Sequence, residues 1–376
     1  MIRVGVIGCG NAGNQIAELA FKTLSIPSLA INSSEKDLST ISIDKIAIGT
    51  QGSGKDRNIA KKYMKTNVAK LLDVNDAEGI AGLVDDRELV FIISSTGGGS
   101  GSGIAPMLYE FLTKLFPAKS FILIGILPEL RESIGAQQNT IEYLKEVQSI
   151  HGVTYMLYDN AKRNKLAISD ILMSVNADVV EDINILQGYY QFTTPLNSID
   201  EKDTFKIINT PGMLNVSKVF DIKDKDVDNS TIEELLVNYI KNTSPMCEIE
   251  RDGVVKRSGM IINLNSRLQK FMDKSMEKVK AIIGEPIESF EHDFICPDDE
   301  MNRAILILSG LSMPDDRIKS IVRRIDEATE ALLKNKDSSA LDTTSTSDIE
   351  DLRRDEDRSN LGEIDADDIF AKFMKN

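Results

Sequence analysis

The residues of this chain best suited to chemistry form a run of glycines and serines at positions 97–103, which reads GGGSGSG. Glycine has no Cβ, so the backbone N–H groups of such a run can approach a ligand closely. Where a run of this kind leads into a helix, unpaired N–H groups and the positive end of the helix dipole favour an anion. Serine hydroxyls add further donors. The run therefore predicts a phosphate-binding loop.

The segments on either side of this run are those that a phosphate loop requires. Residues 89–93 are apolar without interruption and predict a buried strand, and the apolar residues between Ile104 and Leu115 recur at helical spacing. A flexible linker is the commoner role of Gly/Ser-rich segments. We reject that interpretation because a linker does not lie tightly between a buried strand and an amphipathic helix.

A second glycine motif, GCGNAG at residues 8–13, follows a predicted strand at 2–7 and precedes a helix whose apolar positions begin at Ile16. This is the G-x-G-x-x-G fingerprint of dinucleotide-binding domains in its usual context. The fingerprint also needs an acid at the end of the second strand. That strand ends in Asn-Ser-Ser at residues 32–34, and Glu35 follows only in the next turn. An NAD-dependent oxidoreductase therefore stays an alternative with a partial match.

A third glycine motif at residues 49–56 is one residue short of a Walker A loop. Asp56 stands where that loop has the Ser or Thr that binds Mg²⁺. Three interpretations remain open: a P-loop that uses Lys55, a glycine turn before the basic helix at 61–65, and a lid over a terminal phosphate with Lys55 nearby.

Strands and helices alternate along the first half of the chain. Further strands are predicted at residues 46–48, 121–127 and 153–157. Such alternation predicts an α/β fold with a doubly wound parallel sheet. Ligands of these sheets bind at the carboxyl ends of the strands, so the glycine motifs can converge on one ligand.

A long amphipathic helix is predicted from Ile168 to about residue 188, and three polar residues follow it in a turn before another helix: Asn197, Asp200 and Asp203. Acids at this spacing usually cap a helix. A second hypothesis is that they orient a water molecule towards a phosphate brought from elsewhere.

The remainder of the chain predicts a smaller α+β domain and then a tail. Helices are expected near residues 232–240, 268–283 and 318–332, and strands at 259–264, 290–295 and 304–308. From Lys336 onward the chain has 12 acidic against 6 basic residues and predicts a disordered tail. Residues 364–374 form a short amphipathic segment that could dock on a partner.

The composition limits the classes of partner. Lys and Arg number 44 against 59 acids, so the net charge of −15 argues against nonspecific binding to nucleic acid or to a membrane surface. Three cysteines and two histidines give no disulfide framework and no metal-ligand spacing. We expect a cytoplasmic protein, because neither a signal peptide nor a membrane-spanning segment is evident.

Several of these segments together resemble the tubulin and FtsZ superfamily of polymerising GTPases. Residues 97–103 match its signature GGG[ST]G[ST]G throughout, and residues 10–16 resemble its first phosphate loop. Residues 158–161, with the sequence YDNA, resemble the loop whose Asn recognises guanine. The acids after the long helix resemble the loop that completes the active site of the neighbouring subunit.

The resemblance implies GTP or GDP with Mg²⁺ as ligands and assigns roles to individual residues. It implies that Asn160 and Asn176 contact guanine, that Glu132 binds the ribose, and that Asp200 and Asp203 act in hydrolysis together with Asn197. The residues implied for phosphate binding are Gly10, Asn11, Ala12, Gly13, Asn14, Gly97, Gly98, Gly99, Ser100, Gly101, Ser102 and Gly103.

Two departures from the FtsZ pattern favour the plasmid and phage tubulins of the TubZ type. The acidic motif has one residue more than N-x-D-x-x-D, and the Arg that usually follows the ribose-binding acid is missing after Glu132. The resemblance then implies a head-to-tail homopolymer that moves DNA or phage particles, with the tail as a candidate site for a DNA-binding adaptor. An FtsZ-type division polymer is the alternative.

The resemblance also implies how the chain is divided. The implied parts are a GTP-binding domain (1–166), a central helix and catalytic loop (167–204), a C-terminal domain (205–333) and a tail (334–376).

Overall fold

The computed structural model describes residues 1–71, 79–163, 167–189, 193–194, 197–198, 200–227, 230–250, 254–268, 277–295 and 301–338. Its first half contains β1 (Val4–Cys9), α1 (Gly10–Leu24), β2 (Ser28–Asn32), α2 (Glu35–Leu38), β3 (Asp44–Ala47), α3 (Arg57–Leu71), α4 (Ile80–Asp85), β4 (Leu89–Ser95), α5 (Ser100–Leu115), β5 (Ser120–Leu127), α6 (Ile134–Ser149), β6 (Thr154–Asp159), the 3₁₀ turn η1 (Asn160–Arg163) and α7 (Ile168–Gly188).

The second half contains β7 (Thr193–Thr194), β8 (Asn197–Ser198), α8 (Glu201–Ile208), β9 (Gly212–Phe220), α9 (Asp224–Val227), α10 (Ile232–Asn238), the π-helical turn η3 (Tyr239–Thr243), β10 (Arg257–Leu264), α11 (Glu277–Ile283), β11 (Glu288–Ile295), β12 (Arg303–Leu311) and α12 (Asp315–Ser338).

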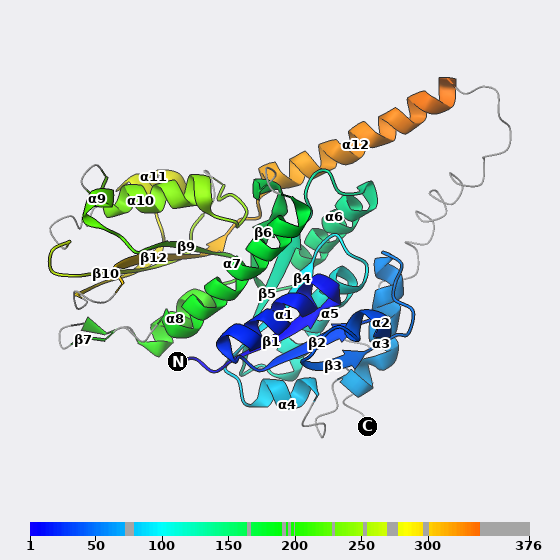
Figure 1. Cartoon of the computed structure of the whole chain (residues 1–376), viewed down its shortest axis with the longest axis horizontal. Coiled ribbons are helices and arrows are strands. Elements are labelled where there is room, and N and C mark those ends of the chain that lie inside the picture. The colour runs from blue at the N-terminus through cyan, green and yellow to red at the C-terminus, as the bar shows by residue number, and fades with distance from the viewer. Residues whose placement is uncertain are drawn as a thin grey trace.

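The first half is a parallel sheet in the order β3-β2-β1-β4-β5-β6, as the alternation of strands and helices predicts. Its central strands are buried on both faces: Phe91 and Ile93 of β4 pack in one apolar cluster, whereas Val90 and Ile92 pack in the other. Helices α1 and α7 cover one face, and α3, α5 and α6 cover the other (Figure 1). The mixed α/β fold with a large parallel sheet is confirmed.

The sheet continues into the second half through β9, which the sequence pattern did not predict. Strand β9 pairs with β6 at only two positions, Thr154 with Gly212 and Tyr155 with Met213, and then pairs antiparallel with β12. Its apolar pattern is interrupted by three buried polar residues: Asn215, Ser217 and Lys218. A strand with buried polar side chains does not show the alternation by which strands are recognised.

The buried ammonium of Lys218 is neutralised within a polar cluster that joins three elements. Its Nζ lies 2.6 Å from Oδ1 of Asp182 on α7, and the Tyr158 hydroxyl on β6 donates to Oδ2 of the same carboxylate at 2.7 Å. Burial raises the pKa of Asp182 to about 6. The cluster ties the long helix α7 to the strands of both halves.

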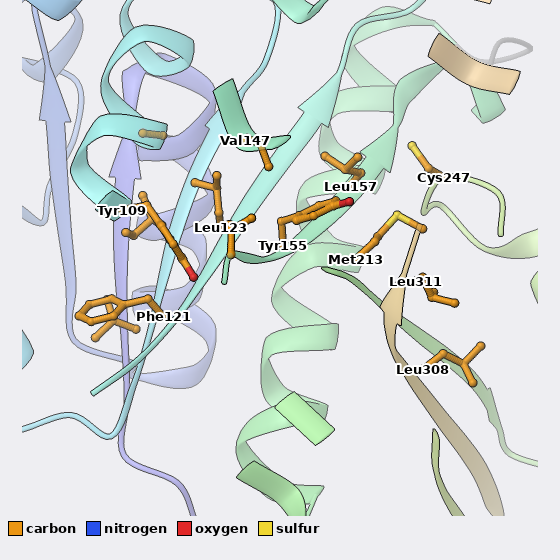
Figure 2. Close-up of a cluster of buried hydrophobic side chains, with 14 of the residues drawn as sticks. Tyr109, Phe121, Leu123, Val147, Tyr155, Leu157, Met213, Cys247, Leu308 and Leu311 are labelled. Atoms are coloured by element: carbon orange, nitrogen blue, oxygen red, sulfur yellow. The ribbon is translucent and has the colours of Figure 1, made fainter. Parts of the chain in front are cut away.

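One apolar core runs across the junction between the two halves. Figure 2 shows Tyr109, Phe121 and Leu123 of the first half continuing through Tyr155 and Leu157 to residues of the second half. The second-half members that it labels are Met213, Cys247, Leu308 and Leu311. Continuous burial of this kind makes the two halves one packed body.

The structure changes the predicted boundaries of three helices. Helix α1 begins at Gly10 and α5 at Ser100, so both start inside the glycine motifs rather than after them. Helix α12 runs to Ser338, beyond the predicted tail boundary at 334. The predicted docking segment 364–374 lies outside the described residues.

Within the described ranges, no helix has the length and apolar character needed to cross a membrane.

Candidate nucleotide site

The first and second glycine motifs pack against each other backbone to backbone at the carboxyl edge of the sheet. Gly10 has φ +71°, and a Cβ on it would lie 2.6 Å from the N atom of Gly101. A Cβ on Gly101 would lie 2.4 Å from the carbonyl oxygen of Cys9. No side chain fits at either position, so glycine is required at both. The two motifs therefore form one surface, as the sheet topology predicts.

The third motif lies beside this surface. A Cβ on Gly99 would be 2.4 Å from Ser53 Oγ and 2.6 Å from Lys55 Cα. The Ser100 hydroxyl is 2.6 Å from that of Ser33 and 3.2 Å from that of Ser53. The turn at residues 49–56 thus joins the glycine loop through both van der Waals contact and hydrogen bonds.

The peptide groups of the glycine loop are oriented by donors that hold their carbonyls. The Gly97 carbonyl accepts from Asn139 Nδ2 at 3.1 Å, the Gly98 carbonyl accepts from the Ser102 hydroxyl, and the Gly99 carbonyl accepts from the Gly103 N–H at 3.1 Å. In a trans peptide the N–H points away from the carbonyl. The next N–H groups along the loop are therefore turned away from these donors. A Cβ on Gly98 would meet nothing within 4 Å, so this side is open.

The loop after β6 presents a buried amide without a protein partner. Asn160 is 6% exposed, and its Oδ1 has no hydrogen bond within the described part of the chain. The preceding Asp159 accepts from the Ala161 N–H at 3.0 Å and from Arg317 Nε at 2.8 Å. Arg317 also donates to the Pro128 carbonyl at 2.7 Å. The start of α12 thereby fixes the loops after β5 and β6, and the buried Oδ1 of Asn160 is left without a hydrogen bond from the described residues.

The other residues predicted to bind nucleotide differ from one another in burial and in their hydrogen bonds. Asn14 is fully buried and its Oδ1 accepts from the Ile31 N–H at 3.2 Å, so it also fastens α1 to β2. The exposed Glu132 follows β5, and its carboxylate accepts from the Glu129 N–H at 2.9 Å. Asn11 is exposed at the start of α1, and Asn176 is half-buried on α7.

The acids after α7 are not brought to the glycine loops. Helix α7 has 21 residues and so extends about 30 Å. Asn160 precedes this helix and Asp200 follows it, and Figure 1 shows α8 beyond the far end of α7. Within one subunit the predicted site is therefore split.

The acidic motif also differs locally from the predicted turn. Asp200 is the N-cap of α8 and accepts from the Lys202 N–H at 2.6 Å. Asp203 lies inside the first turn of that helix, and Asn197 is in β8, paired with Thr194 of β7. The exposed carboxylate of Asp200 keeps one oxygen that this cap does not use.

Two alternatives lose their structural basis. Strand β2 ends at the buried Asn32, and the acids that follow, Glu35 and Asp37, are exposed on α2, so no carboxylate lies where a dinucleotide ribose requires one. Asp56 accepts from the Asn58 N–H at 2.7 Å and caps α3, which is a structural role rather than that of a Walker A hydroxyl.

Sequence reasoning missed three side chains that shape this site: Arg57, Asn139 and Arg317. None lies in a motif, although Arg57 follows the third motif directly. The thiol of Cys9, between the first two glycines, is buried, and burial raises its pKa, so it is an inert part of the core. Within the described ranges, no three His, Cys, Asp or Glu side chains gather as metal ligands.

Part of the chain matches the model of a known protein family. The model of the tubulin/FtsZ family GTPase domain matches residues 3–167. The tubulin-like protein TubZ of Clostridium botulinum C phage is 24% identical over 375 residues, with 92% of each chain covered. CetZ2 of Haloferax volcanii is 22% identical over 343 residues, covering 86% of this chain and 92% of that protein.

Solved structures share the fold. A structure described as a GTPγS-form protofilament of TubZ from Bacillus thuringiensis serovar israelensis superposes with a TM-score of 0.73 at 19% identity. It covers 90% of this chain and 94% of that chain. The matched residues, 3–167, include the glycine loops that pack together at the edge of the sheet. Over residues 3–167 the chain is therefore similar to the GTPase domain of the tubulin/FtsZ family.

Proposed function

We propose that this protein binds GTP, hydrolyses it between subunits and polymerises head to tail into dynamic filaments. The observation that supports this most is the split site: phosphate loops lie before α7 and the candidate catalytic acids lie after it. A subunit with this arrangement binds nucleotide by itself but lacks the group that orients the attacking water.

GTP fits the residues at the sheet edge. The N–H groups of residues 97–103 and of the first turn of α1 would hold the phosphates, and the unpartnered amide of Asn160 would pair with guanine. Mg²⁺ in nucleotide sites binds mainly to phosphates and water. We expect it to enter with GTP beside the hydroxyls of Ser33, Ser53 and Ser100, which meet at this point.

Stacking subunits head to tail would bring Asp200 and Asp203 of one subunit to the nucleotide of the next. A heterologous contact that does not close generates a filament. Loss of the γ-phosphate then removes part of the contact, so hydrolysis destabilises the filament. The TubZ structure above and one of CetZ2 from Haloferax volcanii are described as GTPγS protofilaments, which supports assembly of this kind.

The cargo proposed for such a filament is plasmid or phage DNA, because a phage TubZ matches over 92% of this chain. A DNA-binding adaptor would bind the acidic tail. A division polymer of the FtsZ type is the second candidate within the same family.

One experiment tests assembly-dependent hydrolysis. GTP turnover and right-angle light scattering are measured together against protein concentration. We expect both to rise above the same critical concentration, so that turnover per subunit increases with assembly. Constant turnover per subunit, with no scattering at any concentration, would contradict the proposal. NAD⁺ and ATP serve as nucleotide controls and should support neither signal.

Asn160→Ala is expected to weaken GTP binding by roughly 10- to 100-fold, because a buried hydrogen-bonding partner of the base is lost. The preference for GTP over ATP should fall by a similar factor. The measurement is competition of each nucleotide with a fluorescent GTP analogue below the critical concentration. Asn209→Ala removes an exposed amide whose Nδ2 donates to Ser120 at the start of β5, away from the glycine loops, and should leave both affinities unchanged.

Deletion of residues 339–376 leaves α12 complete and tests the tail. If residues 364–374 dock on the next subunit, the deletion raises the critical concentration by about tenfold, which corresponds to roughly 1.4 kcal/mol of contact energy. A full-length Phe370→Ser/Phe373→Ser variant should reproduce the shift. An unchanged critical concentration together with unchanged adaptor binding would reject a docking role for the tail.

A further inference from the structure

We infer that Arg57 and Asn139 are positioning residues that hold the glycine loop in its phosphate-binding shape, and that they couple this loop to the turn at residues 49–56 and to α6. The inference rests on the proposed function, since it concerns the GTP phosphates. Both side chains donate hydrogen bonds to carbonyl groups of the loop, on the side opposite to the N–H groups that would bind phosphate.

Arg57 begins α3, and only 2% of its surface is exposed. Its Nε donates to the Ser102 hydroxyl at 3.2 Å, and its Nη2 donates to the Ser102 carbonyl at 3.0 Å. The Ser102 hydroxyl in turn donates to the carbonyl of Gly98. The planar guanidinium thereby sets the direction in which this hydroxyl donates, which a point-charge ammonium cannot do equally well.

The other edge of the guanidinium is held by two acids of α6. Nη1 lies 3.0 Å from Glu142, and Nη2 lies 2.6 Å from Glu146, which also pairs with Lys61. A buried guanidinium needs such partners because an unpaired buried charge is costly. The charge is therefore already compensated, and Arg57 is placed to shape the loop rather than to supply a free cation to the phosphates.

Asn139 on α6 connects the loop to the third motif. Its Nδ2 donates to the carbonyls of Gly97 at 3.1 Å, of Gly98 at 3.4 Å and of Lys55 at 3.0 Å. Three carbonyl oxygens converge on one NH₂ group, whose two hydrogens they share, with the contact to Gly98 the longest of the three. A carboxylate of the same shape would repel all three.

The consequence of these contacts concerns charge at the phosphate site. The carbonyls of Gly97 and Gly98 point towards Asn139 and the Ser102 hydroxyl, which donate to them. The N–H groups that follow these carbonyls therefore face the opposite way, towards the open side at Gly98. Without the two side chains, the glycine peptides are free to rotate, because glycine has few backbone constraints. A rotated peptide presents a carbonyl oxygen to the anion. The loss should therefore grow with the number of phosphates bound.

The test compares GTP with GMP for Arg57→Lys and Asn139→Asp. Dissociation constants are measured by calorimetry below the critical concentration, with circular dichroism melting curves as a check on folding. We expect GTP affinity to fall at least tenfold in both variants, whereas GMP affinity changes by less than threefold. Arg3→Lys and Asn242→Asp are matched controls at exposed sites and should leave both affinities unchanged.

Ser102→Ala and Asn139→Ala are the second set, since each removes one link to the loop without burying a new charge. These two variants test the inference if Arg57→Lys or Asn139→Asp does not fold. GTP affinity within twofold of wild type in folded variants would overturn the inference, and so would equal losses for GTP and GMP, which indicate a general structural role. Failure of the wild-type protein to bind GTP would instead reject the proposed function.

Discussion

Gly101→Ala is expected to abolish GTP binding. The new Cβ would lie 2.4 Å from the carbonyl oxygen of Cys9 and 3.2 Å from the Cβ of Ser94. The closer atom belongs to the backbone of β1, so it cannot move aside as the end of a flexible side chain could. The first two glycine motifs must then separate, and phosphate ligands that both motifs hold lose their geometry. A displacement near 1 Å is enough to cost about 100-fold in a preorganised site.

The same chain provides a control for this substitution. Gly135 lies in the first turn of α6, where a Cβ would meet nothing within 4 Å. Gly135→Ala should leave GTP affinity unchanged and raise stability by up to about 1 kcal/mol, because alanine is the better helix former. Titration with a fluorescent GTP analogue and thermal melting measure both effects. GTP affinity of Gly101→Ala within tenfold of wild type would show that the two motifs do not act as one phosphate site.

Asp200→Asn is expected to stop GTP turnover while filaments still form. Asparagine caps a helix as well as aspartate does, so α8 should keep its N-cap bond to Lys202. The substitution removes only the negative charge that would polarise the attacking water. General base catalysis contributes about 100- to 10,000-fold, so turnover should fall by at least the lower figure. Without hydrolysis the filaments should persist as static polymers.

Companion variants separate the role of the charge from that of the cap. Asp200→Ala loses both and should additionally destabilise the protein by about 1 kcal/mol. Asp203→Asn, measured in parallel, shows which acid dominates, and Asp226→Asn serves as a control outside this motif. Turnover and light scattering are followed in the same samples. Wild-type turnover in Asp200→Asn would remove this residue from the catalytic mechanism.

The nucleotide loops and the C-terminal helix are linked more directly than their distance in the chain implies. Arg317 at the start of α12 bonds both Asp159, next to Asn160, and the Pro128 carbonyl. The packing of α12 on the body therefore depends on the same loops that would hold the base and ribose. This contact places the start of α12 beside the candidate nucleotide site.

Part of this architecture could be predicted from local sequence because its physical causes are local. The apolar run at residues 89–93 becomes the fully buried β4, and the glycines at 97–103 become the open end of α5. Parallel strands carry their carboxyl ends to one edge, so the convergence of the three glycine motifs followed from the alternation of strands and helices. The spacing of Asp200 after a long helix likewise predicted its separation from the phosphate loops.

Tertiary structure alone decided which buried polar groups meet. Strand β9 was missed because Asn215, Ser217 and Lys218 break its apolar pattern. The buried Lys218 is stable there because it pairs with Asp182 and Glu181, which lie on another element, α7. Helices α1 and α5 begin inside their glycine motifs, where neighbouring backbones from distant parts of the chain leave no room for a Cβ.

The contacts of Arg57 and Asn139 with the glycine loop show the same limit at the site itself. Arg57 reaches Ser102 from 45 positions away, and Asn139 reaches Gly97 from 42. Periodicity and motifs report local conformation, burial and backbone freedom. They do not indicate which distant donor forms a hydrogen bond with which carbonyl, and these hydrogen bonds determine the shape of the glycine loop.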